Sequence, residues 1–214
     1  LSSGHITVDG RIANSREQEV SDFSEVTIDN QPLTRHKPAR YYMMNKPAGI
    51  LSATKDPQHT TALQLMMPEE SEGLHIAGRL DRATTGLLIL TNDGKWSQHI
   101  TEPKQKIPKC YVVKTVYTLS PDTEQRFTEG IYFAYENSTT SPASIEQLSK
   151  NLCRLTIYEG RYHQVKRMFA AVGNRVKSLH RESMGNIVLD KNLKPGEYRA
   201  LTELEIQSVI NLVK

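Results

Sequence analysis

The stretch LHIAGRLDRATTGLLILT, residues 74–91, decides the class of fold. It contains two apolar runs, Leu74–Ala77 and Leu87–Thr91, and each has the length of one β-strand. Glycines at positions 78 and 86 bound the polar segment between the runs, which predicts a loop. We therefore expect two buried strands with a loop at 78–86.

Strands and helices follow one another irregularly in the rest of the chain. The clearest helix is expected at Tyr162–Val172, where Val165, Met168 and Phe169 continue to Val172 with helical spacing and a Gly-Asn pair follows as a stop signal. Other helices are expected at 94–100 after a cap at Asn92 or Asp93, at 122–128, and from a capping box at Thr202; other strands are expected at 40–45, 110–116, 145–148, 152–158, 176–179 and 187–189. Because regular β-α-β alternation is missing, this order predicts an α+β fold with a largely antiparallel or mixed central sheet and flanking helices.

The first 37 residues form a segment of their own. Ile6–Val8 is followed by Asp-Gly and Val26–Ile28 by Asp-Asn, which predicts two short β-hairpins. The segment is too short to bury a core by itself. With a linker at 36–39, the expected division is 1–37 and 38–214. Because the chain begins at Leu1 rather than Met, we expect further residues upstream.

Composition sets limits on the class of protein. The 214 residues are 24% charged and 37% hydrophobic, as in a folded globular protein, and no apolar run is long enough to cross a membrane. Cys110 and Cys153 form no C-x-x-C pair, and nothing marks secretion. We therefore expect reduced cysteines, a cytoplasmic protein and no membrane partner.

Positive charge is concentrated in two segments that contain no acid, although the formal net charge is only +3. Residues 30–55 carry five basic side chains, and residues 160–181 carry six. One such segment is usually only solvated surface. Two of them favour a polyanionic partner.

Asp81 is the first candidate for chemistry. It stands in the middle of the 78–86 loop, where Arg79 and Arg82 flank it and would favour its ionised form. Loops held by a sheet are common catalytic positions, yet most loop aspartates only accept hydrogen bonds from their own turn. The loop by itself favours the second interpretation.

The start of the helix at 162–172 is the second candidate. Its apolar stripe leaves His163, Lys166 and Arg167 at the flanks or on the opposite side, with Gln164 next to Arg167 on the helix surface. The segment is either a solvated basic face or a helix start that directs cationic and amide groups into a cleft. The residues alone leave both interpretations open.

Tyr111 belongs to the strand at 110–116, with Val113, Thr115 and Tyr117 expected on the same face. A tyrosine at strand spacing is more often a core residue, but its ring is also suited to stacking on a base. Histidine pairs with zinc-ligand spacing are missing, as are glycine-rich nucleotide loops and a serine elbow. We therefore expect no metal and no cofactor.

Four short motifs occur in order between residues 46 and 167: Lys46-Pro-x-Gly49, Gly78-Arg-Leu-Asp81 with Thr85-Gly-Leu87, Lys109-x-Tyr111-x-Val113, and Gly160-Arg-Tyr-His-Gln-Val-Lys-Arg167. Together they resemble the RsuA/RluA-type RNA pseudouridine synthases, and the match is closest to the RsuA type, which acts on small-subunit ribosomal RNA. The resemblance covers about residues 40 to 210. It also implies that residues 1–37 are part of an S4-like RNA-binding segment.

The resemblance implies roles for single residues. Asp81 matches the catalytic aspartate, Tyr111 the tyrosine that stacks on the target uracil, and Lys166 the basic partner of the aspartate. Many relatives have arginine at the last position, so Arg167 is a substitute candidate. Seven side chains are expected to contact RNA: Lys46, Arg79, Arg82, Arg161, His163, Gln164 and Arg167.

The function implied is isomerisation of a uridine to pseudouridine in small-subunit (16S) ribosomal RNA, free or in a partly assembled subunit, by a monomeric enzyme. Asp81 would act either as a nucleophile at the anomeric carbon or as a base on a sugar proton. Large-subunit (23S) ribosomal RNA is the alternative substrate. A non-catalytic RNA-binding or ribosome-assembly protein, or a hydrolase that removes the base, are minor alternatives.

Overall fold

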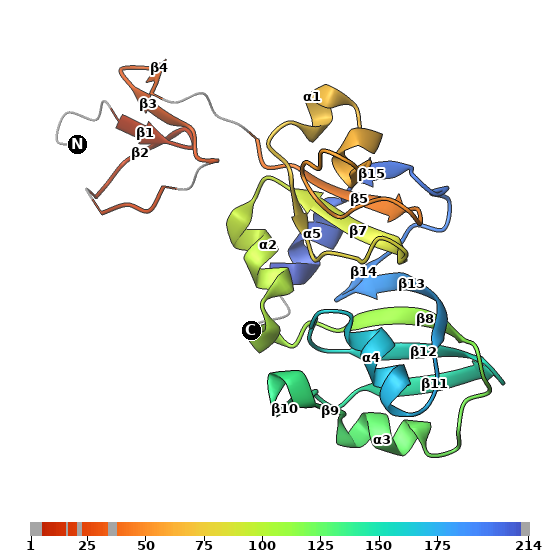
Figure 1. Cartoon of the computed structure of the whole chain (residues 1–214). Helices are drawn as coiled ribbons and strands as arrows, with labels where there is room; N and C mark the ends of the chain where they lie inside the picture. The colour runs from red at the N-terminus through yellow and green to blue at the C-terminus, as the bar shows by residue number, and fades with distance from the viewer. Residues whose placement is uncertain (1–5, 16, 21–22, 34–37, 211–214) are drawn as a thin grey trace. The chain divides into compact units, whose positions relative to one another are not determined.

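The two apolar runs become neighbouring antiparallel strands, β6 (His75–Ala77) and β7 (Thr85–Thr91), in a computed structural model that describes residues 6–15, 17–20, 23–33 and 38–210 (Figure 1). They belong to a sheet that has nine strands in this described part. The other strands are β5 (Tyr41–Lys46), β8 (Lys109–Thr115), β11 (Ser144–Ser149), β12 (Leu152–Ile157), β13 (Val176–Met184), β14 (Ile187–Val188) and β15 (Tyr198–Ala200). The order across the sheet is β11-β12-β8-β13-β7-β5-β15, with β14 beside β13 and β6 beside β7.

One pairing in this sheet is parallel. Thr85 and Gly86 of β7 lie opposite His180 and Arg181 of β13, whereas the other strand pairs of the sheet, within the described residues, are antiparallel. The expected α+β fold with a mixed sheet is confirmed. The parallel pair brings the end of the Asp81 loop against a strand about 95 positions further along the chain.

Both faces of β7 are buried, which explains its uninterrupted apolar sequence. Leu88 and Leu90 join a core cluster that includes residues of α3 and α4, while Leu87 and Ile89 join a second cluster with residues of α2 and α5. The helices are α1 (Pro68–Ser71), α2 (Gly94–Thr101), α3 (Thr123–Glu129), α4 (Gln164–Ala171) and α5 (Glu203–Ile210), with short 3-10 turns at η1 (Ala62–Leu65), η2 (Pro103–Gln105) and η3 (Ala134–Glu136). The turn η3 connects the two strands of a small antiparallel hairpin, β9 (Tyr132–Phe133) and β10 (Ser138–Thr139).

The expected helix caps are present. Asp93 accepts a hydrogen bond from the backbone of Trp96 at the start of α2. At the start of α5, the Glu205 carboxylate accepts from the backbone of Thr202, and the Thr202 hydroxyl accepts from the backbone of Glu205. Each exchange satisfies N–H groups that a helix start leaves without partners.

Several predicted boundaries are wrong. The strand expected at 176–179 continues to Met184 as β13. The helix α4 begins at Gln164 rather than Tyr162, because His163 has a left-handed backbone with φ 49°. Its stripe of Val165, Met168 and Phe169 is buried as expected. The strand β8 ends at Thr115, so Tyr117 does not share its buried face and is 60% exposed.

Residues 1–40 and 41–214 are separate compact units. The described part of the first contains a four-stranded sheet in the order β2-β1-β3-β4, with β1 (Ile6–Val8), β2 (Arg11–Ile12), β3 (Val26–Ile28) and β4 (Gln31–Pro32). Both expected hairpins are present, and each turns through two residues with positive φ. The linker expected at 36–39 lies partly outside the described residues.

Cys110 and Cys153 are free, as expected, and the second is fully buried. No helix in the described part of the chain has the length and apolar character that crossing a membrane requires.

Candidate active site

The loop that carries Asp81 is fastened at both ends by one buried arginine. Arg181 of β13 donates from Nη2 to the carbonyl of Gly78 at 2.7 Å and from Nε to the carbonyl of Leu87 at 2.8 Å. The backbones of β7 and β13 can approach closely here because Gly86 has no side chain: a Cβ at this position would lie 2.3 Å from the backbone carbonyl oxygen of Arg181. Gly86 also has φ +100°, a conformation that residues with a side chain rarely adopt.

The middle of the loop is fastened by a second buried cation. Lys46, at the end of β5, is 0% exposed, and its Nζ donates to the carbonyls of Pro47, Arg82 and Thr84 at 2.9, 3.2 and 2.8 Å. Burial lowers the pKa of Lys46 from 10.5 to about 8, and the negative charge of Asp81 opposes this shift. The expectation that Lys46 contacts RNA is therefore wrong for this structure, since its ammonium is enclosed and bound to the loop.

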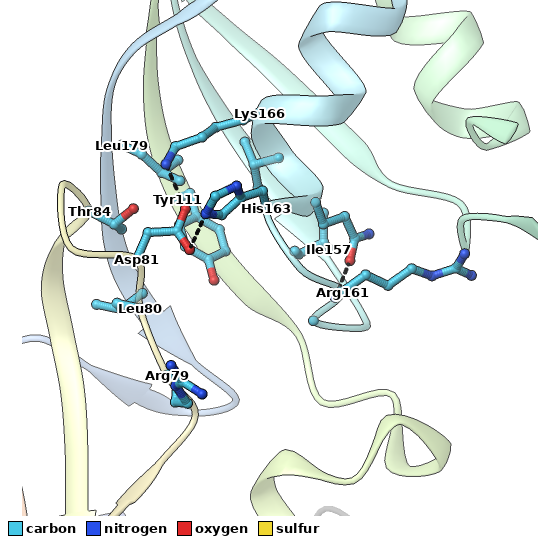
Figure 2. A pocket seen from close by; sticks show the side chains of 13 residues that line it. Arg79, Leu80, Asp81, Thr84, Tyr111, Ile157, Arg161, His163, Lys166 and Leu179 are labelled. Atoms are coloured by element: carbon cyan, nitrogen blue, oxygen red, sulfur yellow. Dashed lines mark hydrogen bonds and ion pairs between the residues drawn. The ribbon is translucent and has the colours of Figure 1, made fainter. Parts of the chain in front are cut away.

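The Asp81 carboxylate lies against the start of α4. Its Oδ2 accepts a hydrogen bond from Lys166 Nζ at 2.7 Å, and its Oδ1 lies 3.4 Å from His163 Nε2 (Figure 2). The Asp81 side chain is 26% exposed, so a ligand in the cleft can still reach it. Of the two interpretations of the basic helix, the structure thus favours a helix start that directs cationic groups into a cleft.

The arginines on either side of Asp81 do not balance its charge. Among the described residues, neither Arg79 nor Arg82 forms an ion pair with the carboxylate. Arg82 Nε donates instead to the carbonyl of Gly49 at 3.1 Å, and Arg79 points away from Asp81 (Figure 2). The sequence prediction is wrong here because neighbours in a tight loop project in different directions.

Tyr111 forms one wall of the pocket at Asp81. It lies on β8 with its ring 7% exposed, belongs to the larger core cluster, and lines the pocket together with Leu80, Ile157 and Leu179 (Figure 2). The core role and the pocket role, which the sequence treated as alternatives, therefore apply to the same side chain.

The opening of this pocket continues into a wider cleft. The cleft has a volume of about 490 Å³ and lies between three segments, 51–56, 79–82 and 160–163. Asp81 and Arg79 line both spaces, and Arg82 lines the cleft. A flat ring inserted beside Tyr111 would thus remain connected to a longer chain in the cleft.

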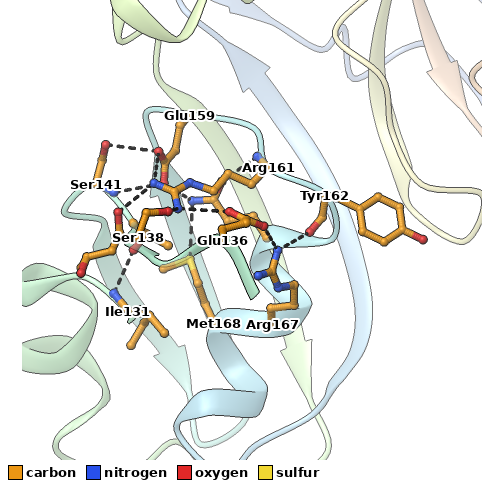
Figure 3. A network of polar contacts seen from close by, with 12 residues as sticks. Ile131, Glu136, Ser138, Ser141, Glu159, Arg161, Tyr162, Arg167 and Met168 are labelled. Carbon is orange, nitrogen blue, oxygen red and sulfur yellow. Dashed lines mark hydrogen bonds and ion pairs between the residues drawn. The ribbon is translucent and has the colours of Figure 1, made fainter. Parts of the chain in front are cut away.

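A polar network holds the turn before α4 in place (Figure 3). The Glu159 carboxylate accepts from the Gln164 amide at 2.9 Å and from Arg161 Nη2 at 3.2 Å. Arg161 also donates to Ser138 at 2.7 Å and to the carbonyl of Thr139 at 2.7 Å. The Gln164 side chain accepts from the backbone of Arg161 at 3.0 Å.

Three of the side chains expected to contact RNA have partners within the protein. Gln164 is 4% exposed and joins the turn to the helix. Arg161 donates to the network and also lines the cleft. Arg167 pairs with Glu136 and lies over the Phe133 ring at 3.7 Å, so it is not a partner of Asp81. These side chains hold the turn that positions His163 and Lys166.

Residues 40–171 match the family model described as RNA pseudouridylate synthase. The chain belongs to this family. Ribosomal small subunit pseudouridine synthase A of Pseudomonas aeruginosa is 47% identical over 98% of this chain and 91% of its own length. The protein of the same description from Escherichia coli K12 is 45% identical over 98% and 91%. A crystal structure of a pseudouridylate synthase has a TM-score of 0.79 at 40% identity and covers 97% of this chain and 90% of its own.

The chain is therefore an RNA pseudouridine synthase, an isomerase, as expected. Sequence reasoning missed two buried cations of this pseudouridine synthase. Arg181 was counted only as part of a basic segment, and Lys109 only as part of a motif, yet they are 1% and 5% exposed. Strand alternation could have predicted the burial of Lys109, because its side chain lies on the same face of β8 as those of Tyr111 and Val113.

The described residues contain no group of three or more histidine, cysteine, aspartate or glutamate side chains that could hold a metal ion.

Proposed function

We propose that this pseudouridine synthase converts a uridine of small-subunit ribosomal RNA to pseudouridine, and that the carboxylate of Asp81 is its catalytic group. The observation that carries the proposal is the position of Asp81, which combines a bound ammonium, an accessible carboxylate and the ring of Tyr111 in one pocket. The choice of RNA rests on the two relatives at 47% and 45% identity, which are described as small-subunit enzymes.

The reaction breaks the bond between uracil N1 and ribose C1′, turns the base, and forms a bond between C5 and C1′. The C5 proton is lost and N1 gains one, so the product is an isomer and no oxidant is needed. An ionised carboxylate at the ribose can attack C1′ or remove a sugar proton. Both routes need the charged form of Asp81, whose Oδ2 accepts a charge-assisted hydrogen bond from the Lys166 ammonium.

The target base must leave its stack before Asp81 can reach the sugar. This costs a few kcal/mol. Stacking of one base on an aromatic ring contributes about 1–3 kcal/mol of binding free energy. Tyr111 supplies that ring, and Arg79 and Arg82 in the cleft supply charge for the RNA backbone. These contributions together offset the cost of flipping.

Asp81→Asn tests the catalytic assignment. The variant keeps the shape of the side chain but loses its charge, so release of tritium from RNA labelled at uracil C5 should fall to background. Asp56→Asn is the matched control: Asp56 lines the same cleft but accepts hydrogen bonds from the backbone of Gln58 and His59. Tritium release by Asp81→Asn at the wild-type rate would overturn the assignment.

Carbodiimide mapping of ribosomal RNA from a strain that lacks the gene tests the substrate. One modified uridine should disappear from small-subunit RNA. An unchanged small-subunit map with a lost site in large-subunit RNA would favour the alternative substrate. Mass spectrometry of the product adds a check on the reaction, because pseudouridine has the mass of uridine whereas loss of the base does not conserve mass.

A further inference from the structure

A second pocket lies next to the one at Asp81, and the two share Arg79, Tyr111 and Gly160. Its volume of about 370 Å³ is in the range of pockets that hold small ligands. Lys109 of β8 and Arg181 of β13 line it, and neither of them lines the pocket at Asp81. We call this space the Lys109 pocket.

The lining of the Lys109 pocket is strongly cationic. It includes three basic side chains, Lys109, Arg181 and Arg79, and no carboxylate. Lys109 and Arg181 are 5% and 1% exposed, so both charges are taken out of bulk water. Burying a charge without a counter-ion is costly, which makes an uncompensated pair of this kind unusual in a core.

Backbone carbonyls use only part of the donors on these groups. Lys109 Nζ donates to the carbonyl of Ile107 at 2.9 Å, and Arg181 donates from Nε and Nη2 to the loop. An ammonium has three N–H donors and a guanidinium five. Within the described ranges neither side chain forms an ion pair. Donors on both groups thus remain for an anion.

The nearest acid does not compensate Lys109. Glu159 raises the pKa of Lys109, but burial and the charge of Arg181 outweigh it and lower that pKa to about 8. The Glu159 carboxylate is itself bound to Arg161, Gln164 and Ser141. A bound anion would relieve the repulsion between Lys109 and Arg181.

We propose that the Lys109 pocket binds a backbone phosphate of the RNA, next to the nucleotide that enters the pocket at Asp81. The proposal rests on the proposed function, because the shared wall of Arg79, Tyr111 and Gly160 brings this pocket within one nucleotide of a base stacked on Tyr111. A phosphodiester supplies one negative charge and acceptor oxygens that match the free donors. Phosphate binding would also brace the Asp81 loop, since Arg181 holds that loop at Gly78 and Leu87.

The test compares binding of RNA oligonucleotides in which a single phosphate is replaced by an uncharged methylphosphonate. The oligonucleotides span the site located by carbodiimide mapping, and each Kd is measured with wild-type enzyme, Lys109→Met and Lys114→Met. Lys114 is the matched control because it lies on the same strand, is exposed, and does not line the Lys109 pocket. A charged hydrogen bond is worth at least about tenfold in Kd.

We expect one replacement beside the target uridine to weaken binding to the wild-type enzyme and to Lys114→Met about tenfold. Lys109→Met should bind the unmodified RNA about tenfold more weakly and show no further loss at that position. Its plot of log Kd against log salt should also be shallower by about 0.7. The proposal would be overturned if Lys109→Met bound the unmodified RNA with wild-type affinity. It would also be overturned if the methylphosphonate beside the target uridine weakened binding to Lys109→Met as much as it weakens binding to the wild-type enzyme.

Two features keep the test decisive. If Lys109→Met does not fold, Lys109→Gln, which keeps a polar side chain, replaces it. The absence of any sensitive phosphate beside the target in the wild-type enzyme refutes the proposal by itself. Tritium release from the unmodified oligonucleotide is measured in parallel. If the RNA is not isomerised but the methylphosphonate still weakens binding, the proposed function is contradicted. If the RNA is isomerised normally but no methylphosphonate weakens binding, phosphate binding in the Lys109 pocket is contradicted.

Discussion

Replacing Lys46 with methionine separates a loop anchor from an RNA contact. Methionine has a side chain of similar length without the ammonium, so the hydrogen bonds to the carbonyls of Pro47, Arg82 and Thr84 are lost. The carbonyl of Arg82 keeps a second donor in the backbone of Gly49, so the loss falls mainly on the carbonyls of Pro47 and Thr84.

The size of the effect follows from those contacts. A buried polar group left without a partner costs about 1–3 kcal/mol, so two carbonyls cost about 2–6 kcal/mol. Removing a buried charge returns part of this. We expect Lys46→Met to lower the free energy of unfolding by about 3 kcal/mol. The turnover rate should also fall, because the carbonyl of Thr84, which loses its anchor, lies three residues from Asp81.

Urea denaturation, steady-state kinetics and the salt dependence of RNA binding measure the three quantities. KM and the salt slope should stay at their wild-type values. Lys55→Met is the control, since Lys55 is an exposed lysine of the same acid-free segment and should change stability by less than about 0.5 kcal/mol. If Lys46→Met had wild-type stability but bound RNA more weakly, with a salt slope reduced by about 0.7–0.9, Lys46 would be an RNA-binding residue and not a loop anchor.

Three further results are expected. Gly86→Ala should lose at least about 3 kcal/mol of unfolding free energy in urea, because its Cβ would meet the Arg181 carbonyl at 2.3 Å, whereas Gly94→Ala, with open space at that position, should not. Between about pH 8 and 10.5 the stability of the wild-type enzyme should rise relative to that of Lys109→Met, because Lys109 has a folded pKa of about 8 and the unfolded chain binds more protons in that window; the same pH dependence in both proteins would contradict this. Lys166→Arg should keep tritium release within about tenfold of wild type while Lys166→Met loses about a hundredfold, and equal rates in both would show that the cation is dispensable.

Local patterns predicted the features that depend on residues close in sequence. The stripe on α4, the cap at Asp93, the capping box at Thr202 and the two hairpin turns all follow from short-range chemistry. Each is fixed by contacts within a few positions, so no knowledge of the tertiary structure was needed.

The errors concern charges whose partners are far away in sequence. Lys46 binds a carbonyl 38 positions away, and Arg181 binds carbonyls 94 and 103 positions away. A basic residue in an acid-free segment therefore looked like exposed surface. The same reason explains Arg161, whose partners in the segment 136–139 lie 22 to 25 positions upstream.

The position of β13 also sets the order in which the enzyme can assemble during synthesis. This strand lies between β8 and β7, so two groups of strands made earlier stay apart until residue 176 has left the ribosome. At roughly 5–20 residues per second, the interval after Asp81 is translated lasts on the order of 5–20 s. During that time the loop has no Arg181 to hold Gly78 and Leu87. A nascent chain thus carries its aspartate on a loop whose ends are not yet held, and competence to modify RNA arrives late, with the closing of the sheet.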